Sequence, residues 1–370
     1  MLPIISAADL PALFINNTPL LDVRSPLEFS RGAFPTATNL PLLNNSERAT
    51  VGTVYKTAGQ QAAITQGNAL VSGVVKSQRM QVWQDYIAQH PDAVLYCYRG
   101  GLRSATVQQW LAAIDIEIPR IAGGYKRMRR ELLHTLEQIA TDMDLLIVAG
   151  KTGSGKTHLI NALQHSLDLE GLANHRGSAF GPRAQGQPTQ IDFENALAIA
   201  LLQQADGQAR RLFLEDESRA IGSLSLPQTL YGKMLAAPIA LLEEPIAQRV
   251  DTILRDYILS NYEEFKAADP ANYPQLFADY LLGSLDKIRR RLGDANYHAL
   301  RASMESALPL TQIEPGAHRE WIMLLLQQYY DPMYAYQLQK KTARIVFRGS
   351  RAELLHWAAK QDVAQQLENA

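Results

Sequence analysis

The chain has 370 residues, of which 46% are hydrophobic and 20% are charged. These values indicate a soluble globular protein of two or three domains. The net charge is −1, from 36 Lys and Arg against 37 Asp and Glu, so the overall charge does not indicate a nucleic-acid-binding protein.

The N-terminal segment MLPIISAADLPALF lacks the basic region, long apolar core and cleavage site of a secretory signal. No apolar run approaches the roughly 18 residues that a membrane span needs. The single cysteine, Cys97, excludes an internal disulfide. We therefore expect a cytoplasmic protein without membrane association.

Short strands alternate with helices in the first part of the chain. The sequence predicts strands over 19–25, 37–42, 93–98 and 117–123, and helices over 25–34, 80–90, 103–114 and 125–139. This alternation predicts a parallel sheet covered by helices on both faces. Residues from about 44 to 78 fit the rhythm poorly, so we interpret them as an insertion that is partly helical.

A second α/β unit is expected beyond a boundary near Ala140. A strand over 145–150 leads into a glycine-rich loop and then a helix over 157–167, and an apolar strand follows at 211–216. Long helices dominate beyond Pro238, apart from a late strand near 343–348. No internal repeat interrupts this organisation.

The glycine-rich loop GKTGSGKT matches the pattern G-x-x-x-x-G-K-[ST], with a strand before it and a helix after it. Backbone N–H groups in such a loop converge on phosphate oxygens, the lysine reaches the outer phosphate, and the hydroxyl is placed to ligate Mg²⁺. The predicted diphosphate-binding residues are Gly150, Thr152, Gly153, Ser154, Gly155, Lys156 and Thr157. At the end of the strand RLFLED, Asp216 is the predicted acidic partner, so Thr157 and Asp216 are the candidate Mg²⁺ ligands.

These features together predict an α/β protein. A parallel-sheet domain spans 1–140, a P-loop NTPase-like α/β core spans 141–237, and a mainly helical extension spans 238–370.

The stretch CYRGGLRS places Cys97 between a buried strand and a helix. The backbone amides of the turn, the helix dipole and two arginines would stabilise a thiolate and would bind an oxyanion in the same cradle. We therefore predict Cys97 as the catalytic residue, with its sulfur open to solvent. The alternative is a buried structural cysteine, since free cysteine is among the most buried residue types. The predicted anion loop consists of Arg99, Gly100, Gly101 and Arg103.

Seven Lys and Arg but only two acidic residues lie between Cys97 and Arg130. Lys126, Arg127, Arg129 and Arg130 are therefore candidates for contacts with phosphate groups, with Arg289–Arg291 and Lys340–Lys341 as more distant basic patches. A solvated helix face explains each of these patches equally well.

The segments LLDVRSPLEFSRGAFPTATNLPL, CYRGGLRS and IAGGYKRMRR together resemble a rhodanese domain. The usual rhodanese loop has four residues between cysteine and arginine, whereas five separate Cys97 from Arg103 here. A loop of this length is similar to that of tyrosine and dual-specificity phosphatases, and it also suits an anion bulkier than thiosulfate.

A rhodanese-like domain ahead of a P-loop domain resembles the bacterial tRNA 2-selenouridine synthase family. The segments SERATVGTVYKTAGQQAAITQGNALV, NHRGSAFG, QPTQIDFENAL and FLEDESRAIG also resemble that family. The resemblance implies that wobble 2-thiouridine of tRNA is geranylated with geranyl diphosphate. Selenium from selenophosphate then replaces the geranylthio group, with Mg²⁺ assisting and without a prosthetic group.

The resemblance also implies a division of labour between the two loops. The P-loop would hold the prenyl donor, while Cys97, Arg99 and Arg103 would handle selenophosphate. Met323, Leu326 and Tyr330 are candidates for an apolar slot for the geranyl chain, although ordinary core packing explains them as well. Two alternatives stay open at this point: a P-loop kinase or Cys-x5-Arg phosphatase with a rhodanese-like accessory domain, and a nucleotide-switched scaffold.

Overall fold

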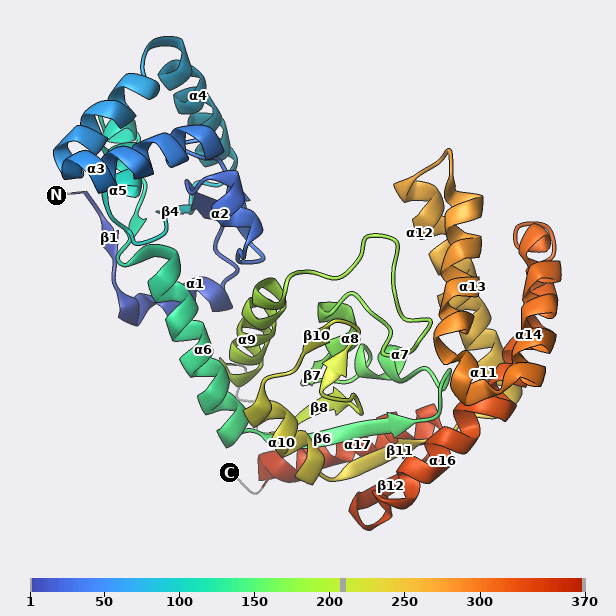
Figure 1. Ribbon diagram of the computed structural model, residues 1–370. Helices are drawn as coiled ribbons and strands as arrows, with labels where there is room; N and C mark the ends of the chain where they lie inside the picture. Colours follow the sequence, from blue (N-terminus) through green and yellow to red (C-terminus); the bar gives the residue numbers. More distant parts are fainter. Residues whose placement is uncertain (1, 207–210, 368–370) are drawn as a thin grey trace. The chain divides into compact units, whose positions relative to one another are not determined.

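The computed structural model describes residues 2–206 and 211–367 (Figure 1). The chain divides into two compact units. The first contains the residues up to Ile139 and the segment from Thr189 that carries helix α9, and the second contains Ala140–Pro188 and the described residues from Arg211 onward. Each unit is described by itself.

The first unit is built on a five-stranded parallel sheet with strand order β1-β5-β4-β2-β3. The central strands β2 and β4 consist wholly of buried residues, as expected for a parallel sheet covered on both faces. The strands are β1 (Ile4–Ile5), β2 (Leu20–Asp22), β3 (Ala37–Asn39), β4 (Val94–Tyr96) and β5 (Arg120–Ile121).

Helices connect and cover these strands, namely α1 (Leu10–Ile15), α2 (Pro26–Ser30), α3 (Asn45–Leu70), α4 (Gly73–Gln89), α5 (Leu102–Ala112), α6 (Gly124–Asp142) and α9 (Gln190–Asp206). The predicted insertion is helical over more of its length than we expected. The Asn44 side chain caps α3 by accepting from the Glu47 amide at 2.9 Å, and Gly59 (φ 83°) bends the helix.

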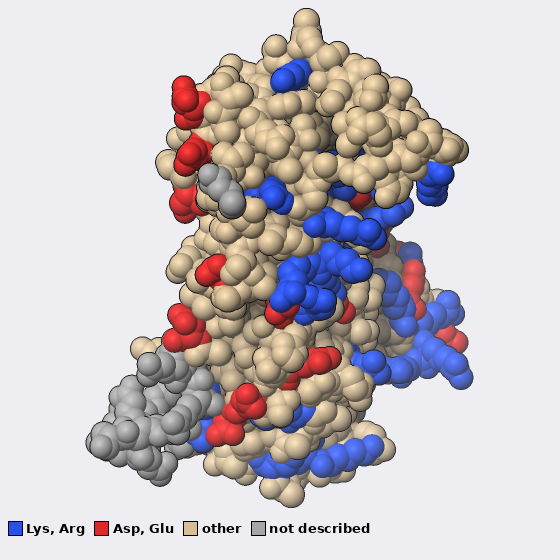
Figure 2. Space-filling model, turned by 90° about the vertical axis from the view of Figure 1, so that its left-hand side faces the viewer, with Lys and Arg blue, Asp and Glu red and all other residues tan. Residues whose placement is uncertain are grey.

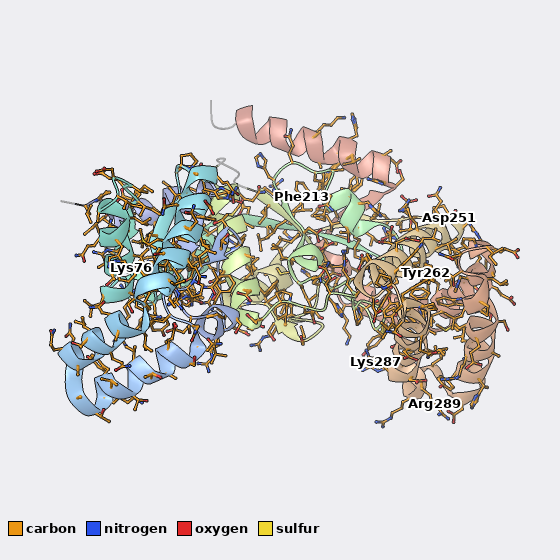
Figure 3. All side chains as sticks on the ribbon, turned by 90° about the horizontal axis from the view of Figure 1, so that it is seen from above. Lys76, Phe213, Asp251, Tyr262, Lys287 and Arg289 are labelled. Carbon is orange, nitrogen blue, oxygen red and sulfur yellow. The ribbon has the colours of Figure 1, made fainter. Side chains whose placement is uncertain are left out.

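The second unit has its own five-stranded parallel sheet, with strand order β12-β11-β6-β8-β7. Six of the seven residues of β6 are buried, and Phe213 of β8, labelled in Figure 3, is fully buried. The strands are β6 (Asp144–Gly150), β7 (Ser166–Leu167), β8 (Arg211–Glu215), β11 (Ile239–Leu242) and β12 (Ile345–Gly349), and β9 (Ala220–Ile221) pairs antiparallel with β10 (Leu224–Ser225).

The C-terminal half of this unit is mainly helical and packs around an apolar core that includes Phe277, Leu281 and Trp321. The π-helical turns Leu254–Leu259 (η2) and Leu326–Tyr330 (η5) interrupt its helices. The helices of the unit are α7 (Lys156–Ile160), α8 (Leu169–Leu172), α10 (Gln228–Ala236), α11 (Ile246–Ile253), α12 (Ser260–Ala268), α13 (Tyr273–Leu292), α14 (Asp294–Ala307), α15 (Arg319–Leu325), α16 (Asp331–Gln339) and α17 (Arg351–Leu367).

The structure confirms the predicted fold class, with two parallel sheets and a helical C-terminal part. Two details differ from the sequence prediction. Helix α7 ends at Ile160 instead of continuing to residue 167, because the chain turns there into β7. Helix α9, placed by the sequence analysis in the P-loop core, belongs to the first unit. Within the described ranges, no helix is both long enough and apolar enough to span a bilayer.

Candidate active site

The thiol loop follows strand β4 and ends at helix α5. The first residues of helix α6 hold the loop in place. The amides of Tyr125 and Lys126 donate to the carbonyls of Cys97 and Tyr98 at 2.9 and 3.0 Å. The Arg120 guanidinium donates to the Gly100 carbonyl. In the described chain, no backbone carbonyl accepts a hydrogen bond from the amides of residues 98–101. The loop carbonyls are therefore occupied, whereas its amides remain available to an anion.

Glycine is required in this loop by close packing as well as by conformation. Gly100 has a φ of 61°, and a Cβ there would lie 2.5 Å from the carbonyl oxygen of Ile121. A Cβ at Gly124 would lie 2.1 Å from the carbonyl oxygen of Cys97. Both positions exclude larger side chains, which keeps the loop tight around the cysteine.

The sulfur itself is buried, since Cys97 is only 3% exposed. Its Sγ lies 3.2 Å from the Ser104 hydroxyl, and the residue packs in the apolar core of the first unit. The expectation that the sulfur is open to solvent is therefore not met. A donor must approach through the amide side of the loop, or the loop must open.

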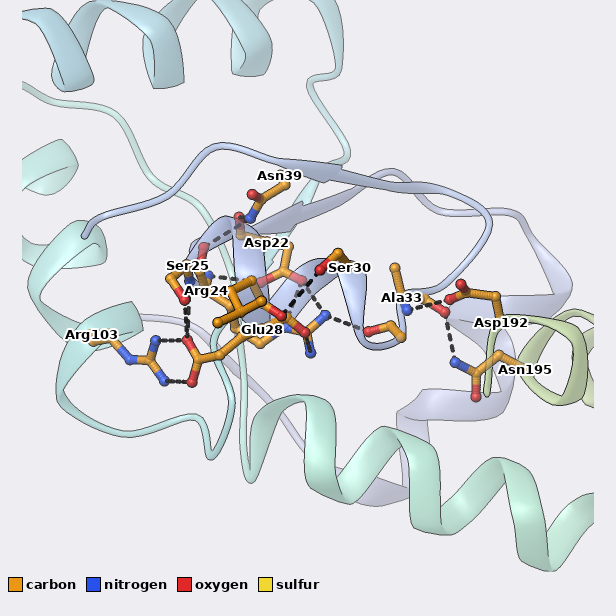
Figure 4. A network of polar contacts seen from close by, with 12 residues as sticks. Asp22, Arg24, Ser25, Glu28, Ser30, Ala33, Asn39, Arg103, Asp192 and Asn195 are labelled. Atoms are coloured by element: carbon orange, nitrogen blue, oxygen red, sulfur yellow. Dashed lines mark hydrogen bonds and ion pairs between the residues drawn. The ribbon is translucent and has the colours of Figure 1, made fainter. Parts of the chain in front are cut away.

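The two predicted arginines of the loop are in different environments. Arg99 is exposed, whereas Arg103 forms a two-pronged ion pair with Glu28 of α2 (Figure 4), with one contact at 3.1 Å. Burial alone would raise the pKa of Glu28, but the hydrogen bond and charge of Arg103 lower that pKa to about 2. Arg103 thus braces the loop against α2, and only Arg99 of the pair is free to face an incoming anion.

The basic residues at the start of α6 also separate into two groups. Lys126 and Arg130 are exposed, and Arg127 pairs with Glu131 at 2.9 Å. Arg129 is held by Glu194 and by the Asn195 amide oxygen at 2.7 Å, so its predicted role as a phosphate contact is replaced by attachment of α9. Figure 2 shows that Lys and Arg side chains are grouped on the face it presents.

The segment from Thr189 that carries α9 is bound to the first unit by polar contacts (Figure 4). The Asp192 carboxylate accepts from the Ala33 amide at 2.6 Å, and the Asn195 amide donates to the Ala33 carbonyl at 2.6 Å. These contacts give a structural role to residues within QPTQIDFENAL.

The P-loop lies between β6 and α7. Gly153 and Gly155 have φ values of 80° and 78°, which only glycine adopts readily, and a Cβ at Gly153 would lie 2.8 Å from the Arg249 carbonyl. The Lys156 ammonium donates to the Gly150 carbonyl at 3.1 Å. The backbone at these two positions is therefore one that glycine supports, as expected for a phosphate-binding loop.

A buried ion pair between Arg249 and Asp331 supports the P-loop. Arg249 is 2% exposed and donates to the Thr152 carbonyl at 2.9 Å. Its guanidinium pairs with Asp331 at 2.6 Å, and Lys151 contacts the same carboxylate at 3.4 Å. The position of the P-loop thus depends on a charged contact from the helical part of the unit.

Carboxylates surround the hydroxyl of Thr157. This hydroxyl lies 2.8 Å from Glu215 and 3.0 Å from Glu170. Burial and the charge of Glu170 raise the pKa of Glu215 to about 8, and burial also raises the pKa of Glu170 and of Glu217. The raised pKa values mean that burial favours the protonated, neutral form of these carboxyl groups.

The sequence analysis placed Asp216 beside Thr157, but the structure brings Glu215 there instead. The Asp216 carboxylate is bound by the Lys341 ammonium at 2.6 and 2.7 Å. It still lines the cavity around the P-loop, although its charge is already compensated. The candidate metal ligands therefore become Thr157 and Glu215.

The cavity at the P-loop has a volume of about 970 Å³. Acidic residues line one part of it, and Arg176 and Ser178 contribute from the segment NHRGSAFG. The basic residues Lys287, Arg290 and Arg291 line it from α13, where Figure 3 labels Lys287. The cavity therefore presents donors to an anionic ligand larger than one phosphate group.

A glycine-rich loop between a buried parallel strand and a helix, completed by Lys156 and Thr157, defines a P-loop phosphate-binding protein. The family model described as the tRNA 2-selenouridine synthase AAA domain matches residues 143–365.

The full chain has relatives that carry the same name. A tRNA 2-selenouridine synthase from Pseudomonas fluorescens is 49% identical over 356 residues, covering 95% of this chain and 98% of the relative. One from Hahella chejuensis is 50% identical over 94% of this chain and 92% of its own, and one from Shewanella piezotolerans is 46% identical over 95% and 98%. The chain belongs to the tRNA 2-selenouridine synthase family, which is a family of enzymes.

Sequence reasoning missed several residues of the site. Glu170 and Glu215 approach Thr157 from separate elements, and Arg176 enters the cavity wall where it donates to Asn261. The resemblance of NHRGSAFG and FLEDESRAIG to the family was the available signal, because those segments contain Arg176 and Glu215.

Proposed function

We propose that this enzyme converts 2-thiouridine in tRNA to 2-selenouridine in two steps, with a geranylated intermediate. The observation that carries the proposal is the identity of 49% over 95% of the chain with a relative named tRNA 2-selenouridine synthase. The same name favours tRNA modification over the kinase, phosphatase and scaffold alternatives.

In the first step, the sulfur at C2 of the uridine attacks C1 of geranyl diphosphate. A C–S bond forms and the C–O bond breaks, the diphosphate leaves with the electron pair, and N3 loses its proton. The P-loop supports this step, because Lys156 lines its cavity and would bind the leaving diphosphate together with the loop amides. Lys156→Ala should therefore weaken binding of geranyl diphosphate.

The residues around Thr157 fit a magnesium ion. Hydroxyl and carboxylate oxygens are its preferred ligands, and a cation would compensate the charges of Glu215 and Glu170. Bound Mg²⁺ would supply neutralisation of the diphosphate charge.

In the second step, selenium of selenophosphate attacks C2 and the geranylthio group leaves as geranylthiol. Water then cleaves the P–Se bond to release phosphate, and N3 regains a proton. The amides of residues 98–101 and the exposed Arg99 are the groups that would receive selenophosphate. Cys97 would help to deliver selenophosphate from this loop without forming a bond to selenium, although its burial requires approach from within the loop.

The tRNA is an anionic substrate, and the exposed basic residues support its binding. Lys126 and Arg130 lie on α6 near the thiol loop in sequence, while Lys287, Arg290 and Arg291 line the P-loop cavity. Phosphate contacts from such residues give an affinity that falls steeply with salt. The target base must leave its stack to reach either loop.

Mass spectrometry of tRNA containing 2-thiouridine tests the proposal. With geranyl diphosphate alone, the wild-type enzyme should produce S-geranyl-2-thiouridine. Addition of selenophosphate should convert this product to 2-selenouridine. Steady ATP or GTP turnover without tRNA, and an unchanged nucleoside, would contradict the proposal.

A further inference from the structure

The thiol loop carries an exposed aromatic side chain to which the proposed chemistry gives no role. Tyr98 directly follows Cys97, and 38% of its surface is exposed. Its ring is stacked on the ring of Tyr125, with the centroids 6.2 Å apart and an angle of 22° between the planes. Tyr125 thus covers one face of the Tyr98 ring, and exposed surface remains for a second planar group.

A buried set of contacts fixes the position of the Tyr98 ring. Tyr125 is 8% exposed, and the guanidinium carbon of Arg24 lies 3.9 Å from its ring centroid. Arg24 is itself 1% exposed, and its Nε donates to the Asp22 carboxylate at 2.8 Å. The backbone is held as well, because the Tyr98 carbonyl accepts from the Lys126 amide at 3.0 Å. A ring that is already held in place loses little conformational entropy when a ligand stacks on it.

The charges near this ring in sequence favour a nucleic acid as its partner. Arg99 of the loop and Lys126 and Arg130 of α6 are all exposed. Single-stranded RNA is bound by this combination, because unstacked bases lie on aromatic rings while the phosphates contact cations. An acidic protein segment would use the cations but would leave the flat face of the ring without a matching partner.

We infer that Tyr98 is the stacking platform for the target uridine while that base is at the thiol loop. The inference rests on the proposed function and adds a positioning residue to its second step. The amides proposed to receive selenophosphate begin at Tyr98 itself, so a base stacked on this ring lies beside that anion site. Stacking would then hold C2 of the base near the incoming selenium.

Selenation of tRNA that already carries S-geranyl-2-thiouridine measures this role. Tyr98→Leu removes the ring and should lower kcat/KM of this step about tenfold or more, mainly by raising KM, because stacking stabilises the bound base before and during the reaction. Tyr98→Phe keeps the ring face and should stay within about twofold of the wild type. Geranylation by Tyr98→Leu should be unchanged, because that step uses the P-loop.

Tyr336→Leu is the control for loss of an exposed tyrosine, since Tyr336 is 62% exposed and belongs to the second unit. This variant should selenate geranylated tRNA as the wild type does. The inference is overturned if Tyr98→Leu selenates as well as Tyr336→Leu, if Tyr98→Phe loses as much activity as Tyr98→Leu, or if Tyr98→Leu loses geranylation and selenation equally.

A binding measurement separates the inference from the proposed chemistry. The full chain is mixed with an anticodon stem-loop RNA that carries 5-iodouridine at the wobble position, and near-ultraviolet light is applied. An iodinated base reacts with the aromatic ring on which it stacks, so mass spectrometry should locate the cross-link at Tyr98. A wobble base that forms no cross-link to the thiol loop would also overturn the inference. The proposed function fails separately, if the cross-link forms at Tyr98 but wild-type protein does not selenate geranylated tRNA.

Discussion

The ion pair between Glu28 and Arg103 should control the stability of the thiol loop. Arg103 holds the ionised form of Glu28, and the fall of the Glu28 pKa from 4.5 to about 2 corresponds to about 3 kcal/mol. The Glu28→Gln substitution keeps the shape but removes this charge, so it should destabilise the first unit by up to about 3 kcal/mol at pH 7. A folded-state pKa below the unfolded value stabilises above pH 4.5, and this contribution is lost as the pH falls toward 2.

Hydrogen exchange of the full chain can measure this effect locally. In Glu28→Gln, the amides of Ala105, Tyr125 and Lys126, which donate to carbonyls of the thiol loop, should exchange faster than in the wild type. The factor should be about a hundred if the full 3 kcal/mol is lost. Glu47→Gln is a matched control, because Glu47 forms a comparable pair with Arg79, at 2.8 Å, that includes no residue of the thiol loop. The reasoning is refuted if Glu28→Gln and Glu47→Gln accelerate exchange of these amides equally, or if neither does.

Three further predictions follow from the contacts of charged and buried groups. Lys126→Ala should lower the salt slope of tRNA binding by about one, whereas Arg129→Ala should leave that slope unchanged and destabilise the first unit, as filter binding and thermal unfolding can show. Asp331→Asn leaves Arg249 buried without its counter-charge, so it should lower the free energy of unfolding by about 3 kcal/mol and weaken inorganic diphosphate binding. An unchanged free energy of unfolding and an unchanged affinity would argue against the supporting role of this pair. Burial lowers the pKa of His318 to about 4, so the free energy of unfolding should fall by about 3 kcal/mol as the pH drops from 6.5 toward 4. In urea titrations, His318→Gln should abolish that part of the pH dependence.

The P-loop could be located from the sequence because its motif is local. All of its phosphate-binding groups lie within eight consecutive residues, and the strand and helix around it have clear patterns. The same holds for the position of Cys97 at the end of a buried strand. The fold class followed from the alternation of strands and helices for the same reason.

The acidic partner of Thr157 could not be chosen from sequence alone. Glu215 ends strand β8 and Asp216 follows it, and both lie near the P-loop, because Asp216 lines the cavity there. Which of the two carboxylates meets the Thr157 hydroxyl depends on the twist and register of β8 against β6, and these are set by the whole sheet. Lys341, which binds Asp216, is 125 residues away in the chain.

Long-range pairing also explains the errors around the thiol loop. Arg103 appears free in the sequence, yet Glu28 lies 75 residues earlier and takes up its charge. Arg129 likewise appears to belong to a basic surface, but it is paired with Glu194, 65 residues away. Charge patterns along a chain do not reveal such partners, because they depend on tertiary structure.

A crossed comparison of two variants tests the central claim most directly, namely that two loops handle two donors. Cys97→Ser and Lys156→Ala should each be supplied first with tRNA containing 2-thiouridine, geranyl diphosphate and selenophosphate, and then with already geranylated tRNA and selenophosphate. The nucleosides are analysed by mass spectrometry. The account predicts that Cys97→Ser accumulates S-geranyl-2-thiouridine, whereas Lys156→Ala forms little of it but still selenates tRNA that is already geranylated. Equal loss of both activities in a folded Cys97→Ser protein would contradict the account.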